Sequence, residues 1–146
     1  FINKCSDVGV DGLIIPDLPP EEAGSYVKLS HDCNISPILL VAPNSSSKRI
    51  NEISSLAKDL IYCTAILGIT GSPGANKDEL ESYLSKVEQN SICPFIVGFG
   101  IKDNIDVRSV NKHAHGAVVG SAIISRLNNC NEPINIVSNY VSELIK

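Results

Sequence analysis

The sequence contains no methionine, and its first residue is Phe1. A newly translated chain begins at an initiator methionine. We therefore expect these 146 residues to be a fragment or a processed product of a longer protein. On this interpretation, residues upstream of Phe1 hold part of the function.

Three further absences exclude broad classes of protein. The 12 basic residues are outnumbered by 16 acidic ones and form no basic patch, so nucleic acid is not an expected partner. The apolar runs are strand-length, far below the roughly 20 residues that span a bilayer. No basic start is followed by a long apolar stretch, so no signal peptide is indicated and we expect a cytoplasmic protein.

A metal-binding motif is also missing. The five cysteines are isolated, without a C-x-x-C spacing, and their odd number suits a reducing compartment. His113 and His115 form a His-x-His pair, but this pair falls between a weak helical segment and a strand, where surface polar residues are common. We therefore expect no metal and no cofactor in this chain.

Five short apolar segments recur along the chain, and a helical pattern follows each one. Such near-continuous apolar runs are typical of strands that are buried on both faces. The clearest helical pattern places Leu80, Tyr83, Leu84 and Val87 on one face. The predicted strands are residues 12–15, 37–41, 60–64, 95–97 and 117–119.

Several helix boundaries and faces can also be predicted. Pro20 is placed as a first helical residue, with Glu21 and Glu22 in the first turn. Asp103 is the expected cap of a weak helix that carries Ile105 and Val110. The final helix is expected to begin near Pro133 and to present one apolar face, made of Ile134, Val137, Val141, Leu144 and Ile145.

Two of the strand ends carry glycine turns. The segments 95–101 and 118–123 both run from an apolar strand into glycine and then into an expected helix. Free N–H groups and the helix dipole make such a turn a ready phosphate site. Two turns in successive units suggest one shared anion, although glycines there could also serve only to allow tight turns.

Successive strand–helix units indicate an α/β protein with a parallel sheet, either open or closed into a barrel. In a TIM (β/α)8 barrel the common phosphate site follows strands seven and eight and includes a short extra helix. The predicted short helix at Gly120 fits that place. The five strands would then be strands 4–8, and residues 1–146 would be the C-terminal portion of one barrel domain of about 250 residues, without its first three βα units.

Taken together, these motifs resemble the alpha subunit of tryptophan synthase. The matching stretches run in the family's order across nearly the whole chain: residues 9–19, Ala42-Pro43-Asn44, Gly68-Ile69-Thr70-Gly71, Gly98-Phe99-Gly100-Ile101 and 119–123. The resemblance implies retro-aldol cleavage of indole-3-glycerol phosphate to indole and glyceraldehyde 3-phosphate. It also implies a partner, the pyridoxal-phosphate-dependent beta subunit of an alpha2beta2 tetramer, which alone would hold the cofactor.

The same resemblance assigns roles to individual residues. The catalytic glutamate and aspartate of the family fall before Phe1, so no catalytic acid or base is expected in this chain. Leu40, Tyr62, Thr70 and Phe99 would line the substrate pocket, with Thr70 on a mobile loop. Leu40 and Phe99 could equally be core residues, and the alternatives to the favoured roles of Tyr62 and Thr70 are a core tyrosine and an ordinary loop residue. The expected phosphate ligands are Gly71, Gly100, Gly120 and Ser121.

Two features keep alternatives open. Asp17 and Pro19 match residues at the contact with the beta subunit, but Asp17 could instead cap the next helix. Ala65-Ile66-Leu67 stands where the family usually has Ser-Arg before the loop glycine, which puts loop closure in question. The alternatives are another phosphate-binding barrel of amino-acid or sugar-phosphate metabolism, a non-catalytic subunit that activates a partner, and a truncated product without function.

Overall fold

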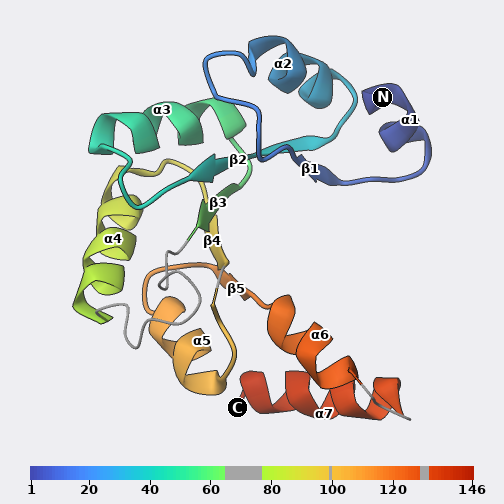
Figure 1. Cartoon of the computed structure of the whole chain (residues 1–146). Helices are drawn as coiled ribbons and strands as arrows, with labels where there is room; N and C mark the ends of the chain where they lie inside the picture. Colours follow the sequence, from blue (N-terminus) through green and yellow to red (C-terminus); the bar gives the residue numbers. More distant parts are fainter. Residues whose placement is uncertain (65–76, 99, 129–131) are drawn as a thin grey trace.

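Five parallel strands lie side by side in sequence order, each joined to the next through a helix (Figure 1). The computed structural model describes residues 1–64, 77–98, 100–128 and 132–146. The strands are β1 (Gly12–Ile14), β2 (Ser36–Val41), β3 (Ile61–Thr64), β4 (Phe95–Gly98) and β5 (Gly116–Val118). All five predicted strands are therefore confirmed within one or two residues of their expected bounds.

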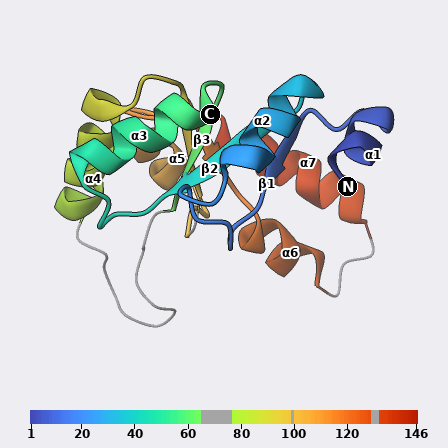
Figure 2. The ribbon, with the colours of Figure 1, turned by 90° about the horizontal axis from the view of Figure 1, so that it is seen from above.

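The helices lie along one face of this sheet. Figure 1 shows α2 to α5 in an arc outside the strands, with α6 and α7 beyond β5, and Figure 2 shows α6 beside α7 from a second direction. Sequential parallel order with helices outside is the arrangement of part of a βα-barrel. The helices are α1 (Ile2–Asp7), α2 (Gly24–Asp32), α3 (Ser47–Ala57), α4 (Lys77–Asn90), α5 (Asn104–Val110), α6 (Ser121–Leu127) and α7 (Pro133–Leu144).

The core lies between the sheet and α2 to α5. Side chains alternate along each strand, so every second residue points toward the helices. Those residues are almost fully buried: Leu39 and Val41 of β2, Ile61 and Cys63 of β3, and Phe95 and Val97 of β4. The helices contribute Ile50, Ile53, Tyr83, Leu84 and Val87 to the same cluster.

The opposite face of the sheet is apolar but only half buried. In the register, Leu40, Tyr62 and Ile96 lie side by side across β2, β3 and β4, and each is intermediate in exposure. On β1, Ile14 is 41% exposed. We call this surface the inner face, because it corresponds to the interior of a closed barrel.

Two helix predictions are corrected. Pro20 does not begin a helix: residues 19–23 form turns, in which the N–H of Glu22 donates to the Pro19 carbonyl at 2.9 Å, and α2 begins at Gly24. Glu21 instead forms an ion pair with Arg49 of α3, which lowers the pKa of the Glu21 carboxyl to about 2. No side chain caps α2, so Asp17 is not its cap.

The apolar faces of the last helices are also corrected. Asp103 caps α5 as predicted, but Ile105 is 65% exposed while Val110 is buried. Ile134 of α7 and Ile145, the C-cap residue of this helix, are 83% and 78% exposed. The side chains of α7 that are buried are Tyr140 and Leu144, so the face that packs is rotated from the predicted one.

Within the described parts of the chain, no helix has the length and apolar character that would let it cross a bilayer.

Candidate functional site

The two glycine turns open at the same edge of the sheet. Gly98 of β4 pairs with Val118 of the parallel strand β5, so the segments that follow them leave the sheet side by side. Gly100 lies in the left-handed region at φ +79°, which glycine adopts without a steric penalty. This turn reverses the chain between β4 and α5, and Gly100 is exposed to solvent.

The second turn leads directly into α6. Gly120 is the N-cap of that helix, and its carbonyl accepts hydrogen bonds from the N–H groups of Ile123 and Ile124 at 2.9 and 3.2 Å. Gly120 and Ser121 are exposed, and a side chain added at Gly120 would meet no atom within 4 Å. Open space beside unpaired helix-start amides is suited to an anion.

Beyond Gly100, the β4–α5 turn is held by side-chain hydrogen bonds. The Asp103 carboxylate accepts from the backbone N–H of Asp106 at 2.9 Å, which is the expected N-cap bond. In return, the Asp106 carboxylate accepts from the backbone N–H of Lys102 at 3.1 Å. These two bonds fix the backbone of residues 102–106 next to the proposed phosphate position.

Tyr62 lies across the inner face and depends on the absence of a side chain at Gly98. A Cβ atom built on Gly98 would lie 1.6 Å from the Tyr62 hydroxyl oxygen and 2.4 Å from the adjacent ring carbon. The ring therefore crosses from β3 over β4, where only glycine leaves room for it. Burial raises the pKa of the Tyr62 hydroxyl, so this group keeps its proton at neutral pH and can donate a hydrogen bond.

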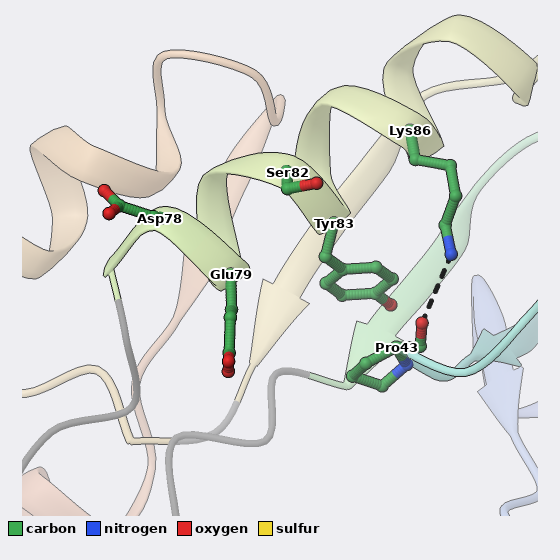
Figure 3. A pocket seen from close by; sticks show the side chains of 6 residues that line it. All are labelled: Pro43, Asp78, Glu79, Ser82, Tyr83 and Lys86. Carbon is green, nitrogen blue, oxygen red and sulfur yellow. Dashed lines mark hydrogen bonds between the residues drawn. The ribbon is translucent and has the colours of Figure 1, made fainter.

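The pocket in Figure 3 lies on the other side of β2, between α4 and the β2–α3 loop. Lys86 extends from α4 to this loop, and its ammonium donates to the Pro43 and Ser45 carbonyls at 3.3 and 2.8 Å. One turn earlier, the buried Tyr83 hydroxyl donates to the Val41 carbonyl at 2.9 Å. Lys86 and Tyr83 thus fix the segment that follows Leu40.

The cysteine nearest this segment is chemically inert. Cys63 is fully buried on β3, and burial raises its thiol pKa to about 12. A thiol that stays protonated is not a nucleophile or a metal ligand. The remaining described cysteines, Cys5, Cys33 and Cys93, are also free thiols.

We expect Tyr83→Phe to lower the free energy of unfolding by about 1–2 kcal/mol, because the Val41 carbonyl loses a buried donor. The loss should be moderate because Thr64 also donates to this carbonyl, at 3.3 Å. Urea unfolding of the complete protein measures the change. Ser82→Ala, at an exposed position on the same helix, is the control and should stay within about 0.5 kcal/mol of the parent. An equal loss in both variants would contradict this role of Tyr83.

The structure brings only part of the predicted site together. Gly100, Gly120 and Ser121 follow neighbouring strands at one sheet edge, and Leu40 and Tyr62 pair on the inner face. Asp17 and Pro19 are exposed in the loop after β1. Gly71, Thr70 and Phe99 lie outside the described residues.

Sequence reasoning missed Lys86 and the role of Tyr83. The sequence pattern places Lys86 on the polar side of an amphipathic helix. No residue near Lys86 in the sequence indicates that its side chain reaches the β2–α3 loop. Tyr83 is predicted only as a core residue, although its hydroxyl forms a specific bond. A buried tyrosine usually finds a hydrogen-bond partner, which was the available signal.

The family model described as tryptophan synthase alpha chain matches residues 1–144. The chain is 38% identical over 129 residues to the tryptophan synthase alpha chain of Desulforapulum autotrophicum, covering 88% of this chain and 51% of that relative. It is 44% identical over 131 residues to that of Chlorobium chlorochromatii, covering 87% and 49%. The chain thus spans about half the length of the curated relatives it matches.

Solved structures agree in fold. The alpha subunit from Campylobacter jejuni is 30% identical, with a TM-score of 0.81, over 99% of this chain and 57% of that one. A chain of the tryptophan synthase α2β2 complex from Pyrococcus furiosus is 26% identical, with a TM-score of 0.87, over 99% and 59%. The parallel half-barrel described above is therefore part of a TIM-barrel fold, and the chain belongs to the tryptophan synthase alpha chain family.

Proposed function

We propose that the chain is the C-terminal part of a tryptophan synthase alpha chain, a cytoplasmic lyase of tryptophan biosynthesis. The complete protein would cleave indole-3-glycerol phosphate to indole and glyceraldehyde 3-phosphate. The observation that carries this proposal is the family match over residues 1–144, together with two glycine turns at one edge of the sheet. Both the reaction and its substrate belong to the complete protein.

In this proposal the described chain binds the substrate and does not cleave its carbon–carbon bond. The backbone N–H groups at Gly100, Gly120 and Ser121, with Gly71, would bind the phosphate dianion without a lysine. Leu40, Tyr62 and Phe99 would provide an apolar surface for the indole ring, and Thr70 would lie on the loop over it. Holding the phosphate at a fixed place orients the glycerol carbons for cleavage.

Cleavage itself needs two carboxylates. One relays the proton of the glycerol hydroxyl, and the other holds the indole nitrogen while C3 of the ring gains a proton and the carbon–carbon bond breaks. The five strands contain no Asp, Glu or His. The catalytic pair is therefore assigned to the βα units upstream of Phe1.

The proposed partner is a beta subunit, in an α2β2 complex that holds pyridoxal phosphate only in that partner. Asp17 and Pro19 are the proposed contact residues. Their position fits this role, because both are exposed in the loop after β1, at the carboxyl edge of the sheet. That edge also carries the phosphate turns, so a partner there would lie close to the substrate.

We expect the complete gene product to release indole from indole-3-glycerol phosphate and to bind indolepropanol phosphate, with no binding of ribose 5-phosphate analogues. Indole formation and isothermal titration calorimetry measure the two effects. A protein that raises beta-subunit turnover but releases no indole would show that the non-catalytic alternative is correct. Binding of the ribose analogue in place of the indole one would favour another phosphate-binding barrel.

A further inference from the structure

One side chain contacts both the turn at Gly100 and the helix that follows the turn at Gly120. Tyr140 of α7 is 4% exposed, and its hydroxyl donates to the Lys102 carbonyl at 2.8 Å. The guanidinium of Arg126, on α6, lies 3.5 Å from the centre of the Tyr140 ring. Lys102 follows Gly100 by two residues, and α6 begins directly after Gly120. Tyr140 therefore connects the Gly100 turn to the helix that Gly120 caps.

The hydrogen bond to Lys102 completes the fixation of the first turn. The N–H of Lys102 is already bound by the Asp106 carboxylate, so both backbone polar groups of this residue are held by side chains. A backbone fixed at both groups cannot rotate without breaking a bond. The position of the Gly100 turn is thereby tied to α7.

The contact with Arg126 fixes the second turn against the same ring. A guanidinium over an aromatic face is attracted by the ring quadrupole. Arg126 also donates to the Ala122 carbonyl at 3.1 Å, in the first turn of α6. The start of α6 is thus connected to Tyr140 through a side chain that is itself bound to the helix.

Two other contacts hold α7 against α5. The Asn104 amide donates to the Leu144 carbonyl at 3.0 Å, and the Arg108 guanidinium donates to the Lys146 carbonyl. Both join the end of α7 to α5, and neither reaches α6. They can keep α7 in place when Tyr140 is changed, so the effect of Tyr140 on the two turns can be measured in a folded protein.

We propose that Tyr140 is a positioning residue for phosphate binding, which sets the spacing between the Gly100 turn and the start of α6. This inference rests on the proposed function, in which one phosphate is shared by both turns. Amides preorganised around an anion bind it best when their spacing is fixed before binding. Tyr140 is buried and its hydroxyl is bound to the Lys102 carbonyl, so in this proposal it acts only through the turns.

The test is Tyr140→Phe in the complete protein, which removes the hydroxyl and keeps the ring under Arg126. We expect the KM for indole-3-glycerol phosphate and the Kd for inorganic phosphate each to rise about 3- to 10-fold, the range of one lost hydrogen bond. The kcat should change less than twofold, because the catalytic carboxylates are elsewhere. Arg126→Met, which removes the cation from the ring, should raise both constants in the same direction.

The matched control is Tyr26→Phe. The Tyr26 hydroxyl donates to the Leu13 carbonyl at 2.9 Å, so the variant loses the same kind of bond at β1, away from both turns. It should show a similar loss of stability in urea with unchanged KM and Kd. If Tyr140→Phe changes KM and Kd no more than Tyr26→Phe does, or lowers kcat alone, the positioning role is wrong.

The outcomes separate this inference from the proposed function. Phosphorus NMR measures the binding of inorganic phosphate. If the parent protein binds phosphate but releases no indole, the proposed function fails. The phosphate Kd of Tyr140→Phe then still decides the role of Tyr140. If the parent binds no phosphate, both the shared site and its positioning residue are overturned. A rise in Kd with an unchanged kcat supports the inference.

Discussion

Gly98→Ala is expected to lower the kcat/KM of the complete protein for indole-3-glycerol phosphate by about a hundredfold, the loss that a misplacement of about 1 Å in a substrate-positioning site can cause. The added Cβ would lie 1.6 Å from the Tyr62 hydroxyl oxygen, well inside van der Waals contact. A tyrosine ring cannot bend away, so the whole side chain must leave its position over β4. The proposed indole pocket then loses one wall, and the Tyr62 hydroxyl moves out of place.

A glycine on the neighbouring strand is the matched control for this substitution. Gly116 of β5 pairs with Ile96, and a Cβ there would lie 3.4 Å from the nearest Ile96 methyl carbon. Gly116→Ala adds the same methyl group to the same face of the sheet, so its kcat/KM should stay within a few-fold of the parent. Similar losses of kcat/KM in both variants would mean that the inner face tolerates no added group. The position of Tyr62 would then not explain the effect of Gly98→Ala.

A double variant separates the packing effect from the functional one. Gly98→Ala alone should cost about 1–3 kcal/mol of unfolding free energy through overpacking. Adding Tyr62→Val removes the clashing ring and should recover most of that stability in urea unfolding. Activity should stay low in the double variant, because the pocket still lacks the tyrosine. Recovery of activity together with stability would show that Tyr62 serves only the fold.

The 146-residue chain alone is expected to release no indole. By the strand register the inner face also includes Ile38, Thr64 and Val118, so its side chains in the described strands are apolar or hydroxyl-bearing. None of them can transfer a proton as a carboxylate does. Binding of phosphate and positioning of the ring do not by themselves supply the proton transfers that cleavage needs.

The measurement compares indole formation by the purified chain with that of the complete gene product at equal concentration. Circular dichroism first confirms that the chain has folded. Co-expression with the upstream segment as a separate polypeptide should restore turnover if the two parts assemble. Turnover by the chain alone would overturn the assignment of the acid and base to residues before Phe1.

Much of the fold could be predicted because its strands are locally encoded. Residues 37–41 and 60–64 are almost wholly apolar, and such runs have few stable places other than a sheet buried between layers. The cap at Asp103 was equally local, because its carboxylate bonds a backbone N–H only three residues away. Gly100 and Gly120 were identified as turn residues for the same reason.

The wrong predictions share a cause. A start of α2 at Pro20 followed from a general preference for proline in the first turn, but Pro19 and Pro20 begin two overlapping turns and Glu21 pairs with Arg49 of α3. On α7, spacing alone cannot tell which side meets the protein. The Tyr140 hydroxyl donates to the Lys102 carbonyl in the turn before α5, and Arg126 of α6 lies over its ring, and no periodicity in residues 133–145 reveals these partners.

The sequence by itself determined the order of strands and helices, the family, and the two glycine turns. The elements and the turns depend on residues within a few positions of one another, and the family depends on the order of such short motifs along the chain. Only the tertiary structure decided that Tyr62 needs Gly98, that Lys86 holds the Pro43 loop, and that Tyr140 holds Lys102. These partners are 36, 43 and 38 residues apart, and they meet only when parallel strands bring successive βα units together.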